Sequence, residues 1–204
     1  MLEVCLMDVI WNKIQSIAES GNGYIKTSDV EAAGVSRPMI KKYLEAGRLE
    51  QVRKGLYVLT DGFADEFALL QVQSSKAVYS YGTALYLWGL SDRTPHIFDM
   101  TFPRGTNVSR LKKDNANLRC HYVDKEIYEM GITETASPQG ATVKLYDKER
   151  CICDLIRNKD QVDIQLYSQA IKDYFKSKPD NRKLLKYGKA FGIVDKIRTY
   201  MEVL

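Results

Sequence analysis

Apolar residues recur at helical spacing near the start of the chain. Four of them between positions 7 and 19 are close to the i, i+4, i+7 pattern of an amphipathic helix, which predicts a helix there. They are Val9, Ile10, Ile14 and Ile17. A turn-forming run at residues 20–23 ends the pattern, and residues 24–25 are expected to form a short extended segment.

Two further short helices are predicted on either side of Gly34. Ser28 and Glu31 have the spacing of a capping box, in which each side chain bonds the other residue's free backbone amide. The helix that begins there is expected to end at Ala33, because Gly34 supplies a turn. Two short helices joined by a tight glycine turn are typical of the helix-turn-helix motif.

The second helix of this pair is predicted to run from Ser36 to about Ala46. Ser36 is expected to cap it, and Pro38 falls in its first turn, where a missing amide is tolerated. The inward face is predicted to consist of Ile40, Tyr43 and Leu44. The opposite face is largely basic and carries Arg37, Pro38, Lys41, Lys42 and Glu45.

A hairpin is predicted directly after this helix. Residues 49–52 and 56–59 have the composition of two strands, and a basic turn with Arg53 and Lys54 separates them. Together with the preceding helices, this order predicts a winged helix-turn-helix over residues 1–60. Proteins of this class place one helix in the DNA major groove. Arg53 and Lys54 are then expected at the tip of the wing, within reach of a phosphate or the minor groove.

Positive charge is concentrated on these elements. Residues 36–55 hold six cations and two anions, whereas the whole chain has a formal net charge of only +4. Arg37 lies at the start of its helix, where a recognition helix meets base edges, and arginine there can donate two hydrogen bonds to guanine. Lysines more often contact phosphates. The predicted DNA-binding residues are Ser36, Arg37, Pro38, Lys41, Lys42, Arg48, Arg53 and Lys54.

The remaining residues, 61–204, are predicted to form a second domain of the α+β class. Strands are expected at residues 97–102, 118–123 and 142–146, and helices at 149–158, 164–175, 182–191 and 193–203. Two shorter helices precede them, at residues 65–72 and from a cap at Ser80 to near Gly89. The order predicts an α+β fold with a helical carboxy-terminal half.

Two features of this second domain bear on polyanion binding. Residues 104–119 carry a net charge of +4 and residues 176–204 one of +5, which extends the potential contact surface. The candidate additional contacts are Arg104, Arg110, Lys112 and Lys113. Aromatic side chains can also stack on bases, but at helical spacing Tyr79, Tyr81, Tyr86 and Trp88 are interpreted as core residues.

The sequence lacks the motifs of common enzyme classes. It has no Gly-x-Ser-x-Gly elbow, Walker loop or His-Glu-x-x-His. It also contains no Asp/Glu-x-Lys pair, as in many nucleases, and no Gly-Ser of the nucleotidyltransferase loop. We therefore predict a protein that is not an enzyme and needs no cofactor.

The cysteines and the hydropathy of the chain argue against a disulfide-rich, zinc-binding or membrane-spanning protein. Cys5, Cys120, Cys151 and Cys153 are too scattered for a disulfide framework. Structural zinc commonly takes two close pairs of ligands, so the pair at 151 and 153 is interpreted as buried reduced thiols rather than a metal site. No apolar run approaches the ~18 residues of a membrane span, and no signal peptide begins the chain, so a cytoplasmic location is expected.

Several segments together resemble the AbiEi antitoxins of bacterial abortive-infection, or toxin–antitoxin, systems. The amino-terminal segments that carry the resemblance are residues 27–36, 43–50 and 53–57, and the later ones are residues 79–90, 97–102, 146–150 and 154–155. The resemblance implies a winged helix that binds inverted repeats in its own promoter and represses transcription. It also implies a carboxy-terminal domain that counters a toxin of nucleotidyltransferase fold without a stable complex. The alternative from the residues alone is an adaptor whose winged helix binds protein or RNA.

Overall fold

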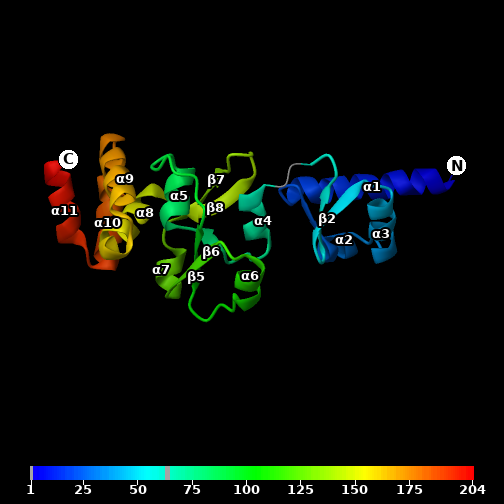
Figure 1. Cartoon of the computed structure of the whole chain (residues 1–204), viewed down its shortest axis with the longest axis horizontal. Coiled ribbons are helices and arrows are strands. Elements are labelled where there is room, and N and C mark those ends of the chain that lie inside the picture. The colour runs from blue at the N-terminus through cyan, green and yellow to red at the C-terminus, as the bar shows by residue number, and fades with distance from the viewer. Residues whose placement is uncertain (1, 63–64) are drawn as a thin grey trace. The chain divides into compact units, whose positions relative to one another are not determined.

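The chain divides into two compact units, each with its own sheet. The computed structural model describes residues 2–62 and 65–204, with side chains from residue 7 onward. One unit comprises Met1–Gln73 with Ser137–Thr142, and the other comprises Ser74–Ala136 with Val143–Leu204. In Figure 1 the first unit runs from blue to cyan, and most of the second runs from green to red.

The first unit combines helices with a three-stranded sheet. Its elements are α1 (Leu2–Ser20), β1 (Tyr24–Lys26), α2 (Thr27–Ala32), α3 (Arg37–Glu45), β2 (Leu49–Arg53), β3 (Leu56–Leu59) and α4 (Glu66–Val72). The sheet has the order β1-β3-β2, and both pairs of strands are antiparallel. The predicted helices, extended segment and hairpin are therefore all present, in the predicted order.

The core of this unit explains why α2 and α3 keep their places. It is formed by Ile14, Ala18, Ile25, Val30, Val35, Ile40, Tyr43 and Leu49. Ile14 and Ala18 lie one turn apart on α1, so their face packs against α2 and the sheet. Between α2 and α3, Gly34 has a φ of +77°, a backbone conformation that a residue with a Cβ adopts only with strain.

The predicted capping box at the start of α2 is wrong. The helix begins after Lys26 without a side-chain capping bond, and the Ser28 hydroxyl bonds the Asp29 carboxylate instead, at 3.0 Å. Glu31 pairs instead with Arg37, whose guanidinium carries the opposite charge. Ser36 does stand at the N-cap position of α3, but its side chain makes no capping bond either.

The second unit is built on a mixed five-stranded sheet with the order β6-β5-β4-β8-β7. β4 is antiparallel to β5 and parallel to β8, while β5 and β6 are parallel. The strands are β4 (Val78–Tyr79), β5 (Phe98–Pro103), β6 (Leu118–Val123), β7 (Ile132–Ala136) and β8 (Thr142–Tyr146). All three predicted strands are present. β4 and β7 were not predicted, since β4 has two residues and β7 alternates only between exposed and half-buried positions.

Helices make up the carboxy-terminal half of this unit, as predicted, and they gather at one end of it in Figure 1. The early helices are α5 (Tyr81–Leu87), α6 (Ser109–Asp114) and α7 (Lys125–Glu129). The later ones are α8 (Lys148–Arg157), a short 3-10 helix (Lys159–Gln161), α9 (Ile164–Lys176), α10 (Asn181–Phe191) and α11 (Val194–Val203). The mixed α+β class is confirmed. Within the described residues, no helix is both long and apolar enough to span a membrane.

Candidate nucleic-acid interface

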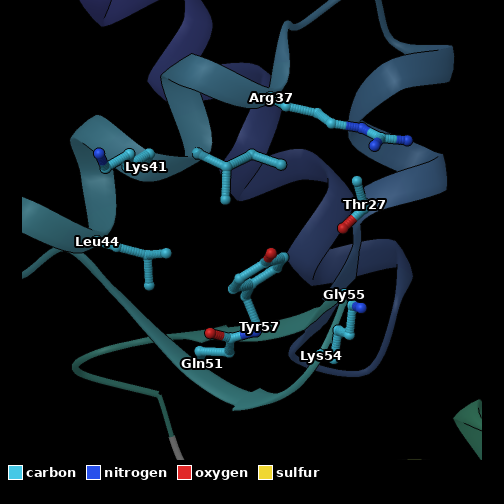
Figure 2. Close-up of a pocket in the computed structure, with 9 residues that line it drawn as sticks. Thr27, Arg37, Lys41, Leu44, Gln51, Lys54, Gly55 and Tyr57 are labelled. Carbon is cyan, nitrogen blue, oxygen red and sulfur yellow. The ribbon is translucent and has the colours of Figure 1, made fainter.

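A groove of about 350 Å³ separates α3 from the β2–β3 hairpin in the first unit. It is lined by Thr27, Arg37, Ile40, Lys41, Leu44, Gln51, Lys54, Gly55 and Tyr57. Figure 2 shows Tyr57 rising from β3 toward α3, with Lys41 and Leu44 across from it. Apolar side chains thus lie between the helix and the strands, while three cations belong to the same lining. We call this lining the basic groove.

The helical period of α3 determines which side chains reach the basic groove. Ile40 and Tyr43 are buried, as predicted for the inward face, whereas Leu44 is half-buried and lines the groove. The Tyr43 hydroxyl donates to the Met7 carbonyl at 2.8 Å. Lys41 and Lys42 are exposed on the remaining surface of the helix. The carboxylate of Glu45 pairs with Lys41 at 3.6 Å, one helical turn away. Because both side chains are exposed, this pair holds Lys41 only weakly.

The predicted DNA-binding residues fall into two sets. Arg37, Lys41 and Lys54 line the basic groove, and Ser36, Pro38 and Lys42 are exposed on or beside α3 without lining it. Arg48 and Arg53 are engaged elsewhere in the unit. The Arg48 guanidinium lies 5.2 Å from the centre of the Trp11 ring, and Arg53 Nη1 donates to Gln73 Oε1 at 2.7 Å.

Four residues near α3 belong to the site but were not predicted from the sequence. Thr27, Gln51 and Tyr57 line the basic groove from the sheet side, and Glu31 contacts Arg37 from α2. Thr27, Gln51 and Tyr57 carry no charge, so a concentration of cations in the sequence does not reveal them. The sequence pattern predicts a capping role for Glu31. The opposite charges of Glu31 and Arg37 across a short glycine turn are the signal that identifies the pair.

The four candidate contacts of the second unit are all exposed cations. Arg104 pairs with Asp124 at 3.1 Å and Arg110 with Asp114 at 3.8 Å. Lys112 Nζ lies 5.7 Å from the centre of the Tyr122 ring, and Lys113 is exposed on α6. Because exposed ion pairs are weak, the two acids reduce the local charge without blocking either arginine.

Three of the residues 146–150 and 154–155 that contribute to the family resemblance, Asp147, Arg150 and Asp154, belong to a buried polar network. Asp147 caps α8 by accepting from the Arg150 amide at 2.8 Å, and its other oxygen accepts from Tyr187 and Lys183, both at 2.9 Å. Burial and the Asp147 carboxylate raise the pKa of Tyr187 to about 12. The Arg150 guanidinium, fully buried, donates to Asp154 at 3.0 Å and to two carbonyls, Ile127 and Met130. This cluster orients helices.

The two cysteines of α8 are buried thiols. Cys151 lies against the Tyr146 carbonyl, and Cys153 against that of Leu184. Burial raises the pKa of both thiols, that of Cys153 to about 12, so both are protonated at neutral pH. In the described part of the chain, no three His, Cys, Asp or Glu side chains are placed to hold a metal ion. The side chain of Cys5 lies outside the described residues.

The aromatic residues predicted as core in the second unit are not equally buried. Tyr79 is fully buried, whereas Tyr81, Tyr86 and Trp88 are half-buried. The Trp88 indole donates to the Tyr146 carbonyl at 2.8 Å, and the Tyr81 hydroxyl accepts from Asn158 at 3.0 Å. Tyr81 and Trp88 are thus held by internal hydrogen bonds, as expected of packing residues.

Comparison with known proteins shows that most of the first unit is similar to a class of transcriptional regulators. Residues 12–60, which include α2, α3 and the hairpin, match a family model described as "Transcriptional regulator, AbiEi antitoxin". This match confirms the resemblance to the AbiEi antitoxin family for the segments that lie within residues 12–60. The match ends at residue 60, so the second unit lies outside it.

The fold as a whole has a counterpart among solved structures. The RV2827C protein from Mycobacterium tuberculosis matches with a TM-score of 0.55 over 89% of this chain and 71% of that one. Sequence identity is 11%, so the likeness concerns the mixed α+β fold alone. The search of curated proteins gave no match.

Proposed function

We propose that residues 1–60 form a winged helix-turn-helix that binds inverted repeats in the promoter of its own operon and represses transcription. The order of α2, the glycine turn, α3 and the hairpin supports this proposal, as does the match to transcriptional regulators. In this arrangement α3 enters the major groove and the hairpin contacts the flanking backbone. A cytoplasmic location follows, because the promoter is there.

The observation that carries the proposal is that cations from two elements line one groove. Arg37 and Lys41 come from α3, and Lys54 comes from the hairpin. A DNA strand between a helix and a wing presents phosphates to both, so the cations stand where its charge would lie. Arg37, at the first position of α3, is the side chain proposed to donate to a guanine.

We further propose that residues 61–204 carry the antitoxin role, against a toxin of nucleotidyltransferase fold and without a stable complex. Support comes from the resemblance of residues 79–90, 97–102, 146–150 and 154–155 to the AbiEi antitoxins, together with the antitoxin description of the family that residues 12–60 match. Co-expression tests this part of the proposal. The full chain should restore growth to cells that express a nucleotidyltransferase-like toxin from the same operon, whereas residues 1–73 should not, and the toxin should not co-purify. Rescue by residues 1–73 alone would contradict it.

Gel-shift titration tests DNA binding. The full-length protein should bind DNA from upstream of its own gene in preference to scrambled DNA of equal length. If six to ten phosphates are contacted, affinity should fall about 10³- to 10⁵-fold between ~50 and ~200 mM salt. Absence of any preference for the upstream DNA would refute the promoter proposal.

Two variants locate the contacts within α3. Arg37→Ala should weaken upstream binding by about 1–3 kcal/mol and relax sequence preference, because a base contact is lost. Lys42→Ala should weaken all sequences about equally, because a phosphate contact is lost. Lys172→Ala, an exposed lysine on α9 of the second unit, is the matched control and should leave binding unchanged.

An adaptor is the second candidate function, and the apolar part of the basic groove favours it. Ile40, Leu44 and Tyr57 line the groove beside the cations, as expected for a surface that receives an apolar side chain of a partner protein. Binding to such a partner changes little with salt, unlike binding to DNA. A salt-insensitive protein partner, together with no preference for upstream DNA, would therefore favour the adaptor.

A further inference from the structure

Glu31 and Arg37 form an ion pair across the α2–α3 turn. The Arg37 Nε donates to one carboxylate oxygen of Glu31, and its Nη2 lies 3.3 Å from the other. Glu31 is in the last turn of α2, and Arg37 is the first residue of α3. In Figure 2 the Arg37 side chain runs from the start of α3 away from Lys41.

The pair uses only one edge of the guanidinium. Arginine has five N–H donors in a planar fork, and Glu31 takes those of Nε and one of Nη2. Nη1 donates to no other group in the described part of the chain. The outer edge, formed by Nη1 and Nη2, is the one that donates to guanine O6 and N7 in bidentate recognition. Arg37 can therefore be held by Glu31 and still meet a base.

Stability does not account for this pair. The side chains are 73% and 42% exposed, and an exposed ion pair contributes little to folding. The hydrogen bond from Arg37 lowers the pKa of Glu31, so the carboxylate is charged at neutral pH. A charged carboxylate at a surface that meets DNA repels phosphates. Because every DNA sequence carries the same phosphates, this repulsion weakens binding to all sequences.

On these grounds, and on the basis of the proposed DNA-binding function, we propose that Glu31 is a positioning residue that determines sequence specificity. It holds Arg37 by the inner edge of its guanidinium, which directs the outer edge to a guanine. Its negative charge also weakens binding to DNA that lacks this guanine. Glu31 thereby increases the ratio of affinity for upstream DNA to affinity for scrambled DNA.

Three variants separate charge from positioning. Glu31→Gln removes the charge and keeps the size, whereas Glu31→Asp keeps the charge but shortens the reach by one methylene. Glu45→Gln is the matched control, because Glu45 is also an exposed carboxylate in an ion pair, but it contacts Lys41 and not Arg37. None of these surface changes is expected to unfold the protein, and circular dichroism verifies this.

The experiment is a gel-shift titration of each full-length variant on upstream and scrambled DNA. Glu31→Gln should lower the affinity ratio about tenfold and strengthen binding to scrambled DNA. Glu31→Asp should lower the ratio without strengthening scrambled binding. Glu45→Gln should strengthen both equally and leave the ratio unchanged. An equal effect of Glu31→Gln and Glu45→Gln, or a ratio that rises in Glu31→Gln, would overturn the proposal.

A second measurement requires no DNA. In the NMR spectrum of the free protein, the Arg37 Nε–H should exchange slowly with water, and both Glu31 variants should accelerate this exchange. Rapid exchange in the wild type would overturn the positioning role by itself. By contrast, slow exchange with no preference for upstream DNA would overturn the proposed function, and with it the role of Glu31 in specificity.

Discussion

At the scale of single residues, two arginines carry the same charge in opposite surroundings. Arg37 is exposed at the start of α3, and its acidic partner Glu31 leaves one edge of the guanidinium open. Arg150 is 1% exposed and is enclosed by a carboxylate, two carbonyls and the rings of Tyr146 and Phe191. Its role is to join α8 to neighbouring segments.

Arg150→Ala should therefore destabilise the protein severely. The change leaves the buried Asp154 carboxylate without its partner, and breaking a buried pair costs about 3–5 kcal/mol. Arg157→Ala, at an exposed position of the same helix, should cost less than about 1 kcal/mol. Urea denaturation compares the two. Equal midpoints would show that the Arg150 network contributes no more than a surface arginine.

At the scale of elements, the two cations of the β2–β3 hairpin, Arg53 and Lys54, have different roles. Arg53 is half-buried at the end of β2 and bonds Gln73, the residue that ends α4. Lys54 is exposed in the turn and lines the basic groove.

Lys54→Ala and Arg53→Ala should thus have different effects. Lys54→Ala should reduce the slope of log affinity against log salt by about 1, with unchanged stability, because a phosphate contact is lost. Arg53→Ala should mainly lower stability, by about 1 kcal/mol, because its bond to Gln73 is removed. Salt-dependent gel shifts and thermal unfolding measure the two quantities. A loss of stability in Lys54→Ala, together with a reduced salt slope in Arg53→Ala, would contradict these roles.

At the scale of the whole molecule, the first unit extends beyond the 60 residues proposed as the DNA-binding domain. Ala68 of α4 packs in a cluster with Tyr24, Leu56 and Val58, and the Tyr24 hydroxyl donates to the Asp65 carbonyl at 2.8 Å. Residues 137–142, which follow β7, also belong to this unit. There the Ser137 hydroxyl donates to the Asp65 carboxylate.

A fragment of residues 1–73 should accordingly be more stable than one of residues 1–60. The longer fragment keeps α4 and its apolar contacts, and burial of one medium-sized apolar side chain contributes about 1.5–3 kcal/mol. We expect a difference of at least ~2 kcal/mol in the free energy of unfolding, measured with urea. Equal stability of the two fragments would show that the folded unit ends at residue 60.

The sequence alone determined the elements of the first unit and the two faces of α3. Periodicity, a glycine turn and a proline near the helix start act within a few residues, so they can be read without knowledge of distant contacts. Three of the strands and the helical half of the second unit were predicted for the same reason. β4 has two residues, too few for a periodic signal.

Only the tertiary structure decided which cations gather at the basic groove and which are bound elsewhere. Arg53 meets Gln73, Arg48 meets Trp11, and Glu31 turns from the predicted cap to Arg37. The partners of Arg53 and Arg48 lie at least 20 positions away in the sequence, beyond the reach of a local pattern, whereas only the fold shows that Arg37 displaces the predicted cap as the partner of Glu31. A charged side chain pairs with the group that folding places beside it, so its partner becomes known only when the chain is folded.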